Sequence, residues 1–305
     1  MKAYPCRELG SVVWAYLGPP GLEPGLPELE WAIVPESHRH ATRRLQECNW
    51  LQGLEGGFDP THLAFLHRGS RVTSTAVNAR GPTAPPSQCG ILPTGCGLML
   101  GNRRGIDGDR NYWSVNQWMM PFHKLITRLN DDAPIGAHVW VPIDDESCMV
   151  YSVEYHPDRP LTDAELEPMT DGRYIHAETL PGSDRTVRNK DNDYLIDREL
   201  QRSGASFTGI FGIGMQDSSI QESMGPLYDR TTEHLGTSDT FLVTIRRHLL
   251  QALSDLEEGS APPGLDPAAY RLRSAGVVAS TSLSFDEAVG DSVIARSAAY
   301  AGMAL

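Results

Sequence analysis

Residues 49–67 read NWLQGLEGGFDPTHLAFLH and contain Asp59, His62 and His67 at the spacing D-x-x-H-x4-H. A neutral imidazole binds a metal through one ring nitrogen while its other N–H is held by a carboxylate or carbonyl, so these residue types suit a metal site. The two histidines lie about 140° apart around an ideal helix. They can therefore share one ion only if the helix ends or distorts between them. Asp59 and Pro60 favour a helix that begins here, with Asp as its N-cap.

The same residues also have a purely structural interpretation. Asp59 could be only an N-cap, and the two histidines could be ordinary, partly buried side chains beside Leu63, Phe65 and Leu66. Short motifs of this kind often match by chance. The choice between the two interpretations depends on the rest of the chain.

Two further segments carry a resemblance together with residues 49–67: RNKDNDYLIDRELQ at 188–201 and QDSSIQESMGPLYDRTTEHLGTSD at 216–239. All three resemble the catalytic domain of Rieske non-heme iron ring-hydroxylating oxygenases, in particular the phthalate 4,5-dioxygenase-like branch. The resemblance implies that His62, His67 and Asp217 bind one mononuclear Fe(II). Such a triad leaves positions open for dioxygen. The competing carboxylates are Asp191, Asp193 and Asp197, and only motif position favours Asp217.

The resemblance also implies partners. Asp59 would link an iron-binding histidine to a histidine that ligates a [2Fe–2S] cluster in the neighbouring subunit. This path implies a ring-shaped homo-oligomer, a trimer or stacked trimers, that receives electrons from a reductase or ferredoxin. The substrates would be dioxygen and an aromatic small molecule.

The composition limits the class of protein. A chain of 305 residues with 40% hydrophobic and 21% charged residues can bury one large domain or two modest ones. The net charge of -13 argues against nucleic acid or an anionic membrane as a partner. Five cysteines without dense spacing read as thiols, and no segment reads as a signal peptide or membrane span. The expected location is the cytoplasm.

The amino-terminal part departs from the resemblance. The Rieske cluster is held by two cysteines and two histidines, spaced in the family as C-x-H and C-x2-H, and no cysteine here has a histidine two or three residues later. Yet YPCRELGSVVWAYLGPP at 4–20 resembles the last strands of the Rieske domain. We therefore expect residues 1–40 to be a remnant of that domain and linker, and residues 41–305 to form the mononuclear iron domain. A truncated reading frame explains this, and a short protein served by a separate cluster protein is the alternative.

The remaining patterns predict an α+β fold. Residues 97–102, 111–120, 137–142 and 149–156 read as successive antiparallel strands, and 39–48 as a strand or a short helix. Thr162 and Glu165 predict a capped short helix, and 238–256 an amphipathic helix that packs on the sheet. This antiparallel sheet with a long C-terminal helix agrees with the helix-grip fold that the resemblance implies.

Five other segments have a weaker pattern. The row Trp113, Val115, Gln117 and Met119 could line a pocket, although core packing is commoner for such residues. Residues 69–88 read as a loop over the site or a plain solvated loop, and the glycine-rich 207–215 lacks a nucleotide-binding context. Asn189, Asn192 and Tyr194 would brace the site or contact substrate. The tail after residue 256 has little to bury.

The sequence thus predicts the catalytic portion of an aromatic ring-hydroxylating oxygenase acting on an aromatic acid, inactive alone without a [2Fe–2S] domain. O-demethylation of a methoxylated aromatic acid is the alternative within the class. A non-catalytic helix-grip binding module is the alternative outside it. A zinc hydrolase ranks last, because the H-E-x-x-H arrangement is absent.

Overall fold

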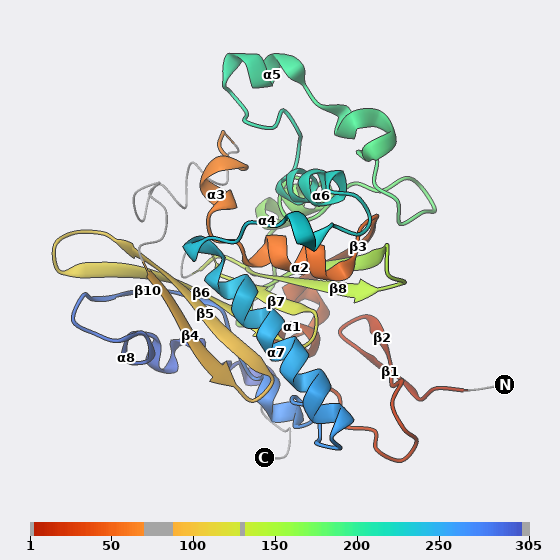
Figure 1. The fold of residues 1–305 in the computed structure, drawn as a ribbon, viewed down its shortest axis with the longest axis vertical. Helices are drawn as coiled ribbons and strands as arrows, with labels where there is room; N and C mark the ends of the chain where they lie inside the picture. The colour runs from red at the N-terminus through yellow and green to blue at the C-terminus, as the bar shows by residue number, and fades with distance from the viewer. Residues whose placement is uncertain (1–2, 70–87, 129–131, 301–305) are drawn as a thin grey trace.

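A curved antiparallel sheet forms the frame of the molecule (Figure 1). The structure is a computed structural model and describes residues 3–69, 88–128 and 132–300. Within these residues, eight strands pair in one sheet in the order β3-β9-β8-β7-β6-β5-β4, with β10 beside β6. Its strands are β3 (Arg39–Gln46), β4 (Gln88–Thr94), β5 (Gly97–Gly105), β6 (Arg110–Met119), β7 (His123–Ile126), β8 (Ile135–Pro142), β9 (Cys148–Tyr155) and β10 (Ala275–Ser280).

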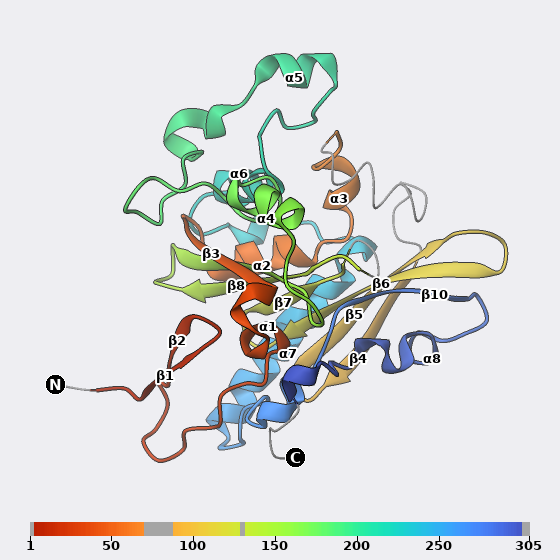
Figure 2. The ribbon, with the colours of Figure 1, turned by 180° about the vertical axis from the view of Figure 1, so that it is seen from behind.

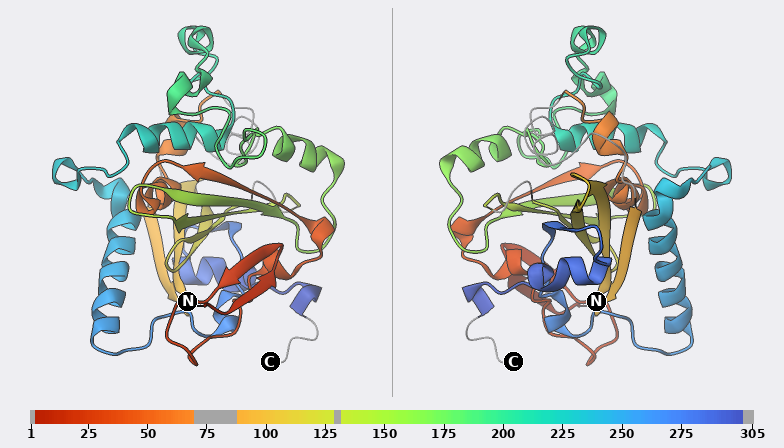
Figure 3. Two further views of the ribbon diagram at one scale, coloured as in Figure 1. Left: turned by 90° about the vertical axis from the view of Figure 1, so that its right-hand side faces the viewer. Right: turned by 90° about the vertical axis from the view of Figure 1, so that its left-hand side faces the viewer.

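The helices cover this sheet and carry the motifs. They are α1 (Glu30–Ile33), α2 (Trp50–Phe58), α3 (His62–Phe65), α4 (Asp163–Thr170), α5 (Arg198–Ser203), α6 (Ile213–Ser223), α7 (Thr240–Glu257) and α8 (Phe285–Val289). In the side views the orange-red and green strands run across the direction of the amber strands, so the sheet bends strongly (Figure 3). The expected α+β class is confirmed.

The long helix α7 packs on the sheet as its periodicity predicts. Phe241 and Ile245 are buried against Leu98 and Trp118 of the sheet. Figure 1 shows α7 crossing the molecule beside β4. Each fully buried side chain of this size contributes about 2 kcal/mol to stability, and these contacts fix one wall of the interior.

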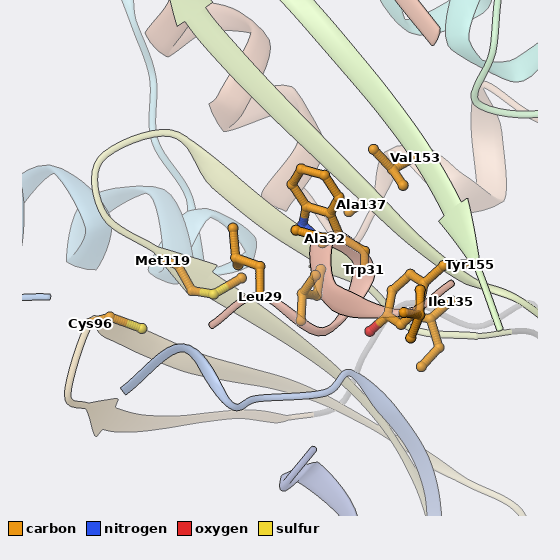
Figure 4. Close-up of a cluster of buried hydrophobic side chains, with 11 residues drawn as sticks. Leu29, Trp31, Ala32, Cys96, Met119, Ile135, Ala137, Val153 and Tyr155 are labelled. Carbon is orange, nitrogen blue, oxygen red and sulfur yellow. The ribbon is translucent and has the colours of Figure 1, made fainter. Parts of the chain in front are cut away.

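The amino-terminal segment packs against the far end of the sheet. Leu29 and Trp31 are buried with Ile135, Val153 and Tyr155 in one cluster (Figure 4). The preceding hairpin, β1 (Cys6–Leu9) and β2 (Val12–Ala15), lies beside α1 and far from α5 (Figure 2). The domain boundary near residue 40 stays a prediction.

Most of the predicted elements are confirmed. The four strands at 97–102, 111–120, 137–142 and 149–156 are β5, β6, β8 and β9, and 39–48 adopts the strand alternative as β3. Thr162 caps α4 in a reciprocal capping box with Glu165. The five cysteines are free thiols. The expected loop 69–88 lies outside the described residues, apart from its two ends.

The prediction for the C-terminal tail was wrong. Residues 275–280 form β10, which pairs with the first half of β6 along the edge that the short β7 leaves open. Phe285 of α8 then packs on Trp113 with ring centroids 4.8 Å apart. The tail offers few apolar residues of its own, but β6 provides both an unpaired edge and an aromatic surface for it. Local composition could not reveal that surface.

Candidate metal centre

Two short helices place the histidines of the D-x-x-H-x4-H motif. Asn49 caps α2, its side chain accepting from the Leu51 N–H at 3.0 Å. The helix ends at Phe58, so Asp59 follows one helix and also lies just before the next, where the sequence predicts a helix start. The Asp59 carboxylate accepts from the N–H groups of Thr61 at 2.7 Å and His62 at 3.0 Å, which starts the single turn of α3. This turn ends at Phe65, so the helix ends between the histidines, as a shared ion requires.

Helix α6 brings the carboxylate to the same place. Asp217 lies in the second turn of α6, because the helix begins at Ile213. Gly212 has a positive φ of 83°, and a Cβ there would lie 2.3 Å from the Gly172 carbonyl oxygen. A Cβ on Gly214 would lie 2.7 Å from the Ile175 carbonyl oxygen. The glycine run therefore allows a close backbone approach that positions Asp217.

The three predicted ligands converge. Asp217 Oδ1 lies 3.1 Å from His67 Nε2 and 3.7 Å from His62 Nε2. One ligand atom from each residue falls within 4.8 Å of the others, and no other such His/Cys/Asp/Glu group of three occurs in the described residues. His67 is 1% exposed, so this centre lies inside the protein.

Hydrogen bonds fix which nitrogen of each ring faces the carboxylate. The Nδ1 of His62 lies 2.6 Å from the Asp59 carbonyl oxygen, which can only accept, so this nitrogen carries the proton. The Nδ1 of His67 lies 2.7 Å from Gln216 Oε1, while Gln216 Nε2 donates to the Ile210 carbonyl at 2.9 Å. That second bond sets the amide orientation, so His67 Nδ1 also donates. Both Nε2 lone pairs therefore point toward Asp217.

This donor set fits a metal. Two neutral imidazoles held through Nδ1 and one carboxylate are the ligands of a non-heme iron(II) site. Burial alone would raise the pKa of Asp217, but the charge and hydrogen bond of His67 lower that pKa to about 2, so the carboxylate is ionised. Burial lowers the pKa of His62 by more than Asp217 raises it, which keeps that ring neutral. Burial alone would lower the pKa of His67, but the charge and hydrogen bond of Asp217 raise that pKa, which favours a proton on Nε2 in the metal-free protein; a bound ion would replace this proton and leave the ring neutral.

The competing carboxylates belong to the outer loop. Asp191 bonds Arg185, and Asp197 accepts from the first N–H groups of α5. Asp193 lies at a kink with a φ of 49° and joins no such metal-ligating group in the described chain. Gln216 was not singled out from the sequence, although it directly precedes Asp217. Its contact with a histidine 149 positions away is visible only in the fold.

The same loop braces α6. Asn189 and Asn192 cap one another's backbone, and the buried Tyr194 donates its hydroxyl hydrogen bond to Glu222 of α6. None of these three side chains lines the cavity beside the metal centre. The structure therefore favours the bracing role over substrate contact. A further ion network, in which Arg246 of α7 and Arg230 hold Glu55 of α2, secures the other motif helix.

A cavity of about 540 Å³ opens beside the three ligands. Its lining includes Tyr112, Ser114 and Asn116 of β6. The alternate row of that strand, from Trp113 to Met119, is packed in the core, which confirms the commoner expectation for such residues over a pocket lining. Large apolar side chains gain most from burial, and the period of two in a strand then turns the polar row toward the cavity.

Three cationic side chains on the strands, Arg44, Arg104 and Lys124, also line this cavity, as does Arg128 after β7. Arg44 is 4% exposed and donates to Ser152 Oγ at 2.9 Å and to the Ile175 carbonyl at 3.2 Å, while Lys124 donates to the Gly57 carbonyl. Within the described residues none of the three has a carboxylate within 4.0 Å. Burial lowers the pKa of all three, to about 8 for Lys124. These three cations therefore have no close ion pair, although the carboxylates of Asp59, Glu154 and Asp217 line the same cavity.

A curved helix-grip sheet with two histidines and one carboxylate beside a cavity is the arrangement of a Rieske oxygenase catalytic domain. Residues 15–283 match the family model described as LigXa C-terminal domain like. The chain belongs to this family, and its curated relatives are Rieske oxygenase alpha subunits.

The relatives include two enzymes of aromatic acids. The 3-chlorobenzoate-3,4-dioxygenase oxygenase subunit of Comamonas testosteroni is 34% identical, over 87% of this chain and 65% of the relative. The phthalate 4,5-dioxygenase oxygenase subunit of Pseudomonas putida is 31% identical, over 86% of this chain and 61% of the relative. NdmB of Pseudomonas putida CBB5 superposes with a TM-score of 0.50 at 16% identity, over 88% of this chain and 63% of that chain, which supports the fold.

The chain therefore spans less than two thirds of the length of these relatives. None of the helices in the described part of the chain combines the length and apolar character that a membrane span requires.

Proposed function

We propose that this chain is the catalytic portion of an oxygenase that activates dioxygen at one mononuclear Fe(II) and oxygenates an aromatic acid. The observation that carries the proposal is the convergence of both Nε2 lone pairs on Asp217. His62, His67 and Asp217 would hold the ion. When bound, the iron supplies dioxygen activation, with electrons delivered from outside the chain.

The protein side chains orient the two histidine rings, exclude water from the cavity and provide charge. Asp59 and Gln216 hold the two rings through Nδ1, so that neither ring can turn its Nε2 away. Phe58, Trp140 and Phe241 give the cavity apolar walls that exclude water and suit an aromatic ring. Arg44, Arg104 and Lys124 line the cavity without a close ion pair and would bind a substrate carboxylate. The names of both relatives, a chlorobenzoate and a phthalate enzyme, agree with this substrate class.

Electron supply requires a partner. Asp59 is partly exposed beside His62, as a residue on an electron path between subunits needs to be. The Asp59 carboxylate accepts the hydrogen bond that starts α3, and the Asp59 carbonyl accepts from Nδ1 of His62. An electron path through Asp59 would therefore also reach the His62 ring through the backbone carbonyl. We propose that a [2Fe–2S] centre of a neighbouring subunit, fed by a ferredoxin or reductase, delivers the electrons within a ring-shaped homo-oligomer.

The first test measures iron. After anaerobic addition of Fe(II), we expect about one iron per chain and a high-spin nitrosyl signal with nitric oxide, both lost in His62→Ala and Asp217→Ala. Asp197→Ala is the matched control, because its carboxylate only caps α5. A folded wild type without stoichiometric iron would refute the metal site and favour the binding module. Loss in Asp197→Ala with retention in Asp217→Ala would show that the wrong carboxylate was chosen.

The second test identifies the reaction. With a ferredoxin, its reductase and NADH, oxygen-dependent conversion of benzoates to hydroxylated products supports ring oxygenation. Release of formaldehyde from methoxybenzoates would instead establish the O-demethylase alternative, since one oxidant can attack a ring or a methyl ether.

A further inference from the structure

One side of the cavity carries a carboxylate among the cations. Glu154 lies on β9, its side chain is 15% exposed, and it lines the cavity. Its Oε2 is buried and has no hydrogen-bond partner among the described residues. His138 of β8, 6% exposed, lines the same wall, and its Nε2 is likewise buried without a partner in that part of the chain. Glu154 and His138 therefore contribute polar side chains to this wall of the cavity, and the buried Oε2 of Glu154 lies against His176.

The chain holds Glu154 in place from behind. His176, fully buried, has its Nδ1 2.6 Å from Thr42 Oγ1 and its Nε2 3.3 Å from Glu154 Oε2, the latter outside hydrogen-bond geometry. The ring of His40 stands edge-on to His176, with centroids 5.0 Å apart. These neighbours fill the space behind the carboxylate. The open side of Glu154 is the side that faces the cavity.

The carboxylate of Glu154 limits which ligand groups can bind beside it in this cavity. It repels a carboxylate and accepts a hydrogen bond, so it calls for an O–H or N–H donor on the ligand. Sites built around such buried polar groups reject analogues that lack the matching group, because the protein atom is then left unpaired. Glu154 would therefore discriminate between substituents on the ring.

The strand order gives the spacing between this acceptor and a cation. Lys124 is on β7, and β8 alone separates β7 from β9. Two strand spacings are about 10 Å, and an offset of two residues is about 7 Å along the strands, so the two Cα atoms lie about 12 Å apart, close to the span of a substituted benzoate with a hydrogen bond at each end. In the register of the sheet, Lys124 pairs with His138, and Glu154 pairs with Gly136. Ile126 and Ile175 pack over Gly136, where a Cβ would meet them at 3.3 and 3.5 Å, so a bound ring would lie against these two side chains.

We propose that the substrate is an aromatic acid that also bears a hydrogen-bond donor, a phenolic hydroxyl or an amino group, which Glu154 accepts while Lys124 and the neighbouring arginines hold the carboxylate. This inference rests on the proposed function for the position of the ring beside the metal centre. It assigns Glu154 as a specificity-determining residue, with His138 completing the polar wall.

The test is direct binding, which needs no turnover. Calorimetry on the full chain, metal-free, compares benzoate with 3- and 4-hydroxybenzoate, 3-aminobenzoate and the two methoxybenzoates. At least one donor-bearing acid should bind tenfold or more tightly than its methoxy counterpart and than benzoate. In Glu154→Leu this preference should disappear while benzoate binding is kept, and in Glu154→Gln, which retains one acceptor, it should be reduced. Glu165→Gln is the matched control, because Glu165 lines the same cavity but is bonded to Arg159.

The outcomes separate this inference from the proposed function. Equal binding of hydroxy and methoxy acids by the wild type, or a preference that survives in Glu154→Leu, overturns the role of Glu154 and leaves the iron site and aromatic-acid class standing. Binding of none of the acids overturns the inference together with the aromatic-acid class, whereas iron content is judged by its own experiment. Thermal unfolding of each variant shows whether it is folded.

Discussion

Replacing Gln216 by Leu should weaken metal binding without removing any ligand. The side chain is 4% exposed, and its Oε1 accepts from His67 Nδ1 at 2.7 Å. Leu is similar in size but cannot accept this bond. The ring of His67 then loses the contact that fixes its tautomer and its orientation toward Asp217.

The structure sets the expected size of the effect. Partners of metal-bound histidines typically contribute 10- to 100-fold to affinity, so Fe(II) or Co(II) affinity should fall by about 1.4 to 2.8 kcal/mol. In the metal-free protein, the buried N–H of His67 is left without its acceptor, which costs about 1–3 kcal/mol of stability. Gln216→Glu keeps an acceptor at the same place and should restore most of the affinity.

Anaerobic competition with a chromophoric chelator measures the affinity, and urea unfolding measures the stability. Gln221→Leu is the matched control on α6, since Gln221 is also buried but bonds Gln46 and the Gly53 carbonyl instead of a ligand. The control should lose stability and keep its metal affinity. Equal metal affinity in the wild type and Gln216→Leu would refute the reasoning.

Three further predictions follow from buried charges. Burial lowers the pKa of His123 to about 4, so the unfolded state binds more protons than the folded state between pH 6.5 and 4. The free energy of unfolding therefore decreases as the pH falls through this window. In urea titrations, the loss of stability on lowering the pH to 5 should be about 2 kcal/mol smaller in His123→Phe than in the wild type. Arg246→Met leaves the 9% exposed carboxylate of Glu55 with Arg230 alone and should cost about 3 kcal/mol in urea unfolding, whereas an unchanged midpoint would contradict this. Burial lowers the pKa of Lys124 to about 8, so the free energy of unfolding of the ligand-free protein rises from pH 8 to 10.5. Lys124→Met should abolish that rise. In calorimetry, the same variant should bind benzoate about tenfold more weakly than the wild type.

The spacing of apolar residues was sufficient to predict the elements in which that spacing is regular. The strands at β5, β6, β8 and β9 and the long helix α7 have apolar residues at periods of two and of three to four, and burial of one face follows from that period. The short β7 and the tail strand β10 have no such signal, because pairing with β6 creates them. The period also could not say which row of β6 faces the cavity, since both rows alternate equally.

The sequence by itself determined the candidate ligands and the class of chemistry. His62 and His67 lie within one short motif, and their five-residue spacing already required the helix to end between them. The tertiary structure decided what depends on distant contacts: that Asp217 meets them where Asp191, Asp193 and Asp197 do not, and that Gln216 orients His67. It also decided that Glu154 and Lys124 line the same cavity. Ligand type is a local property of the chain, whereas orientation and electrostatics arise only when strands and helices far apart in sequence pack together.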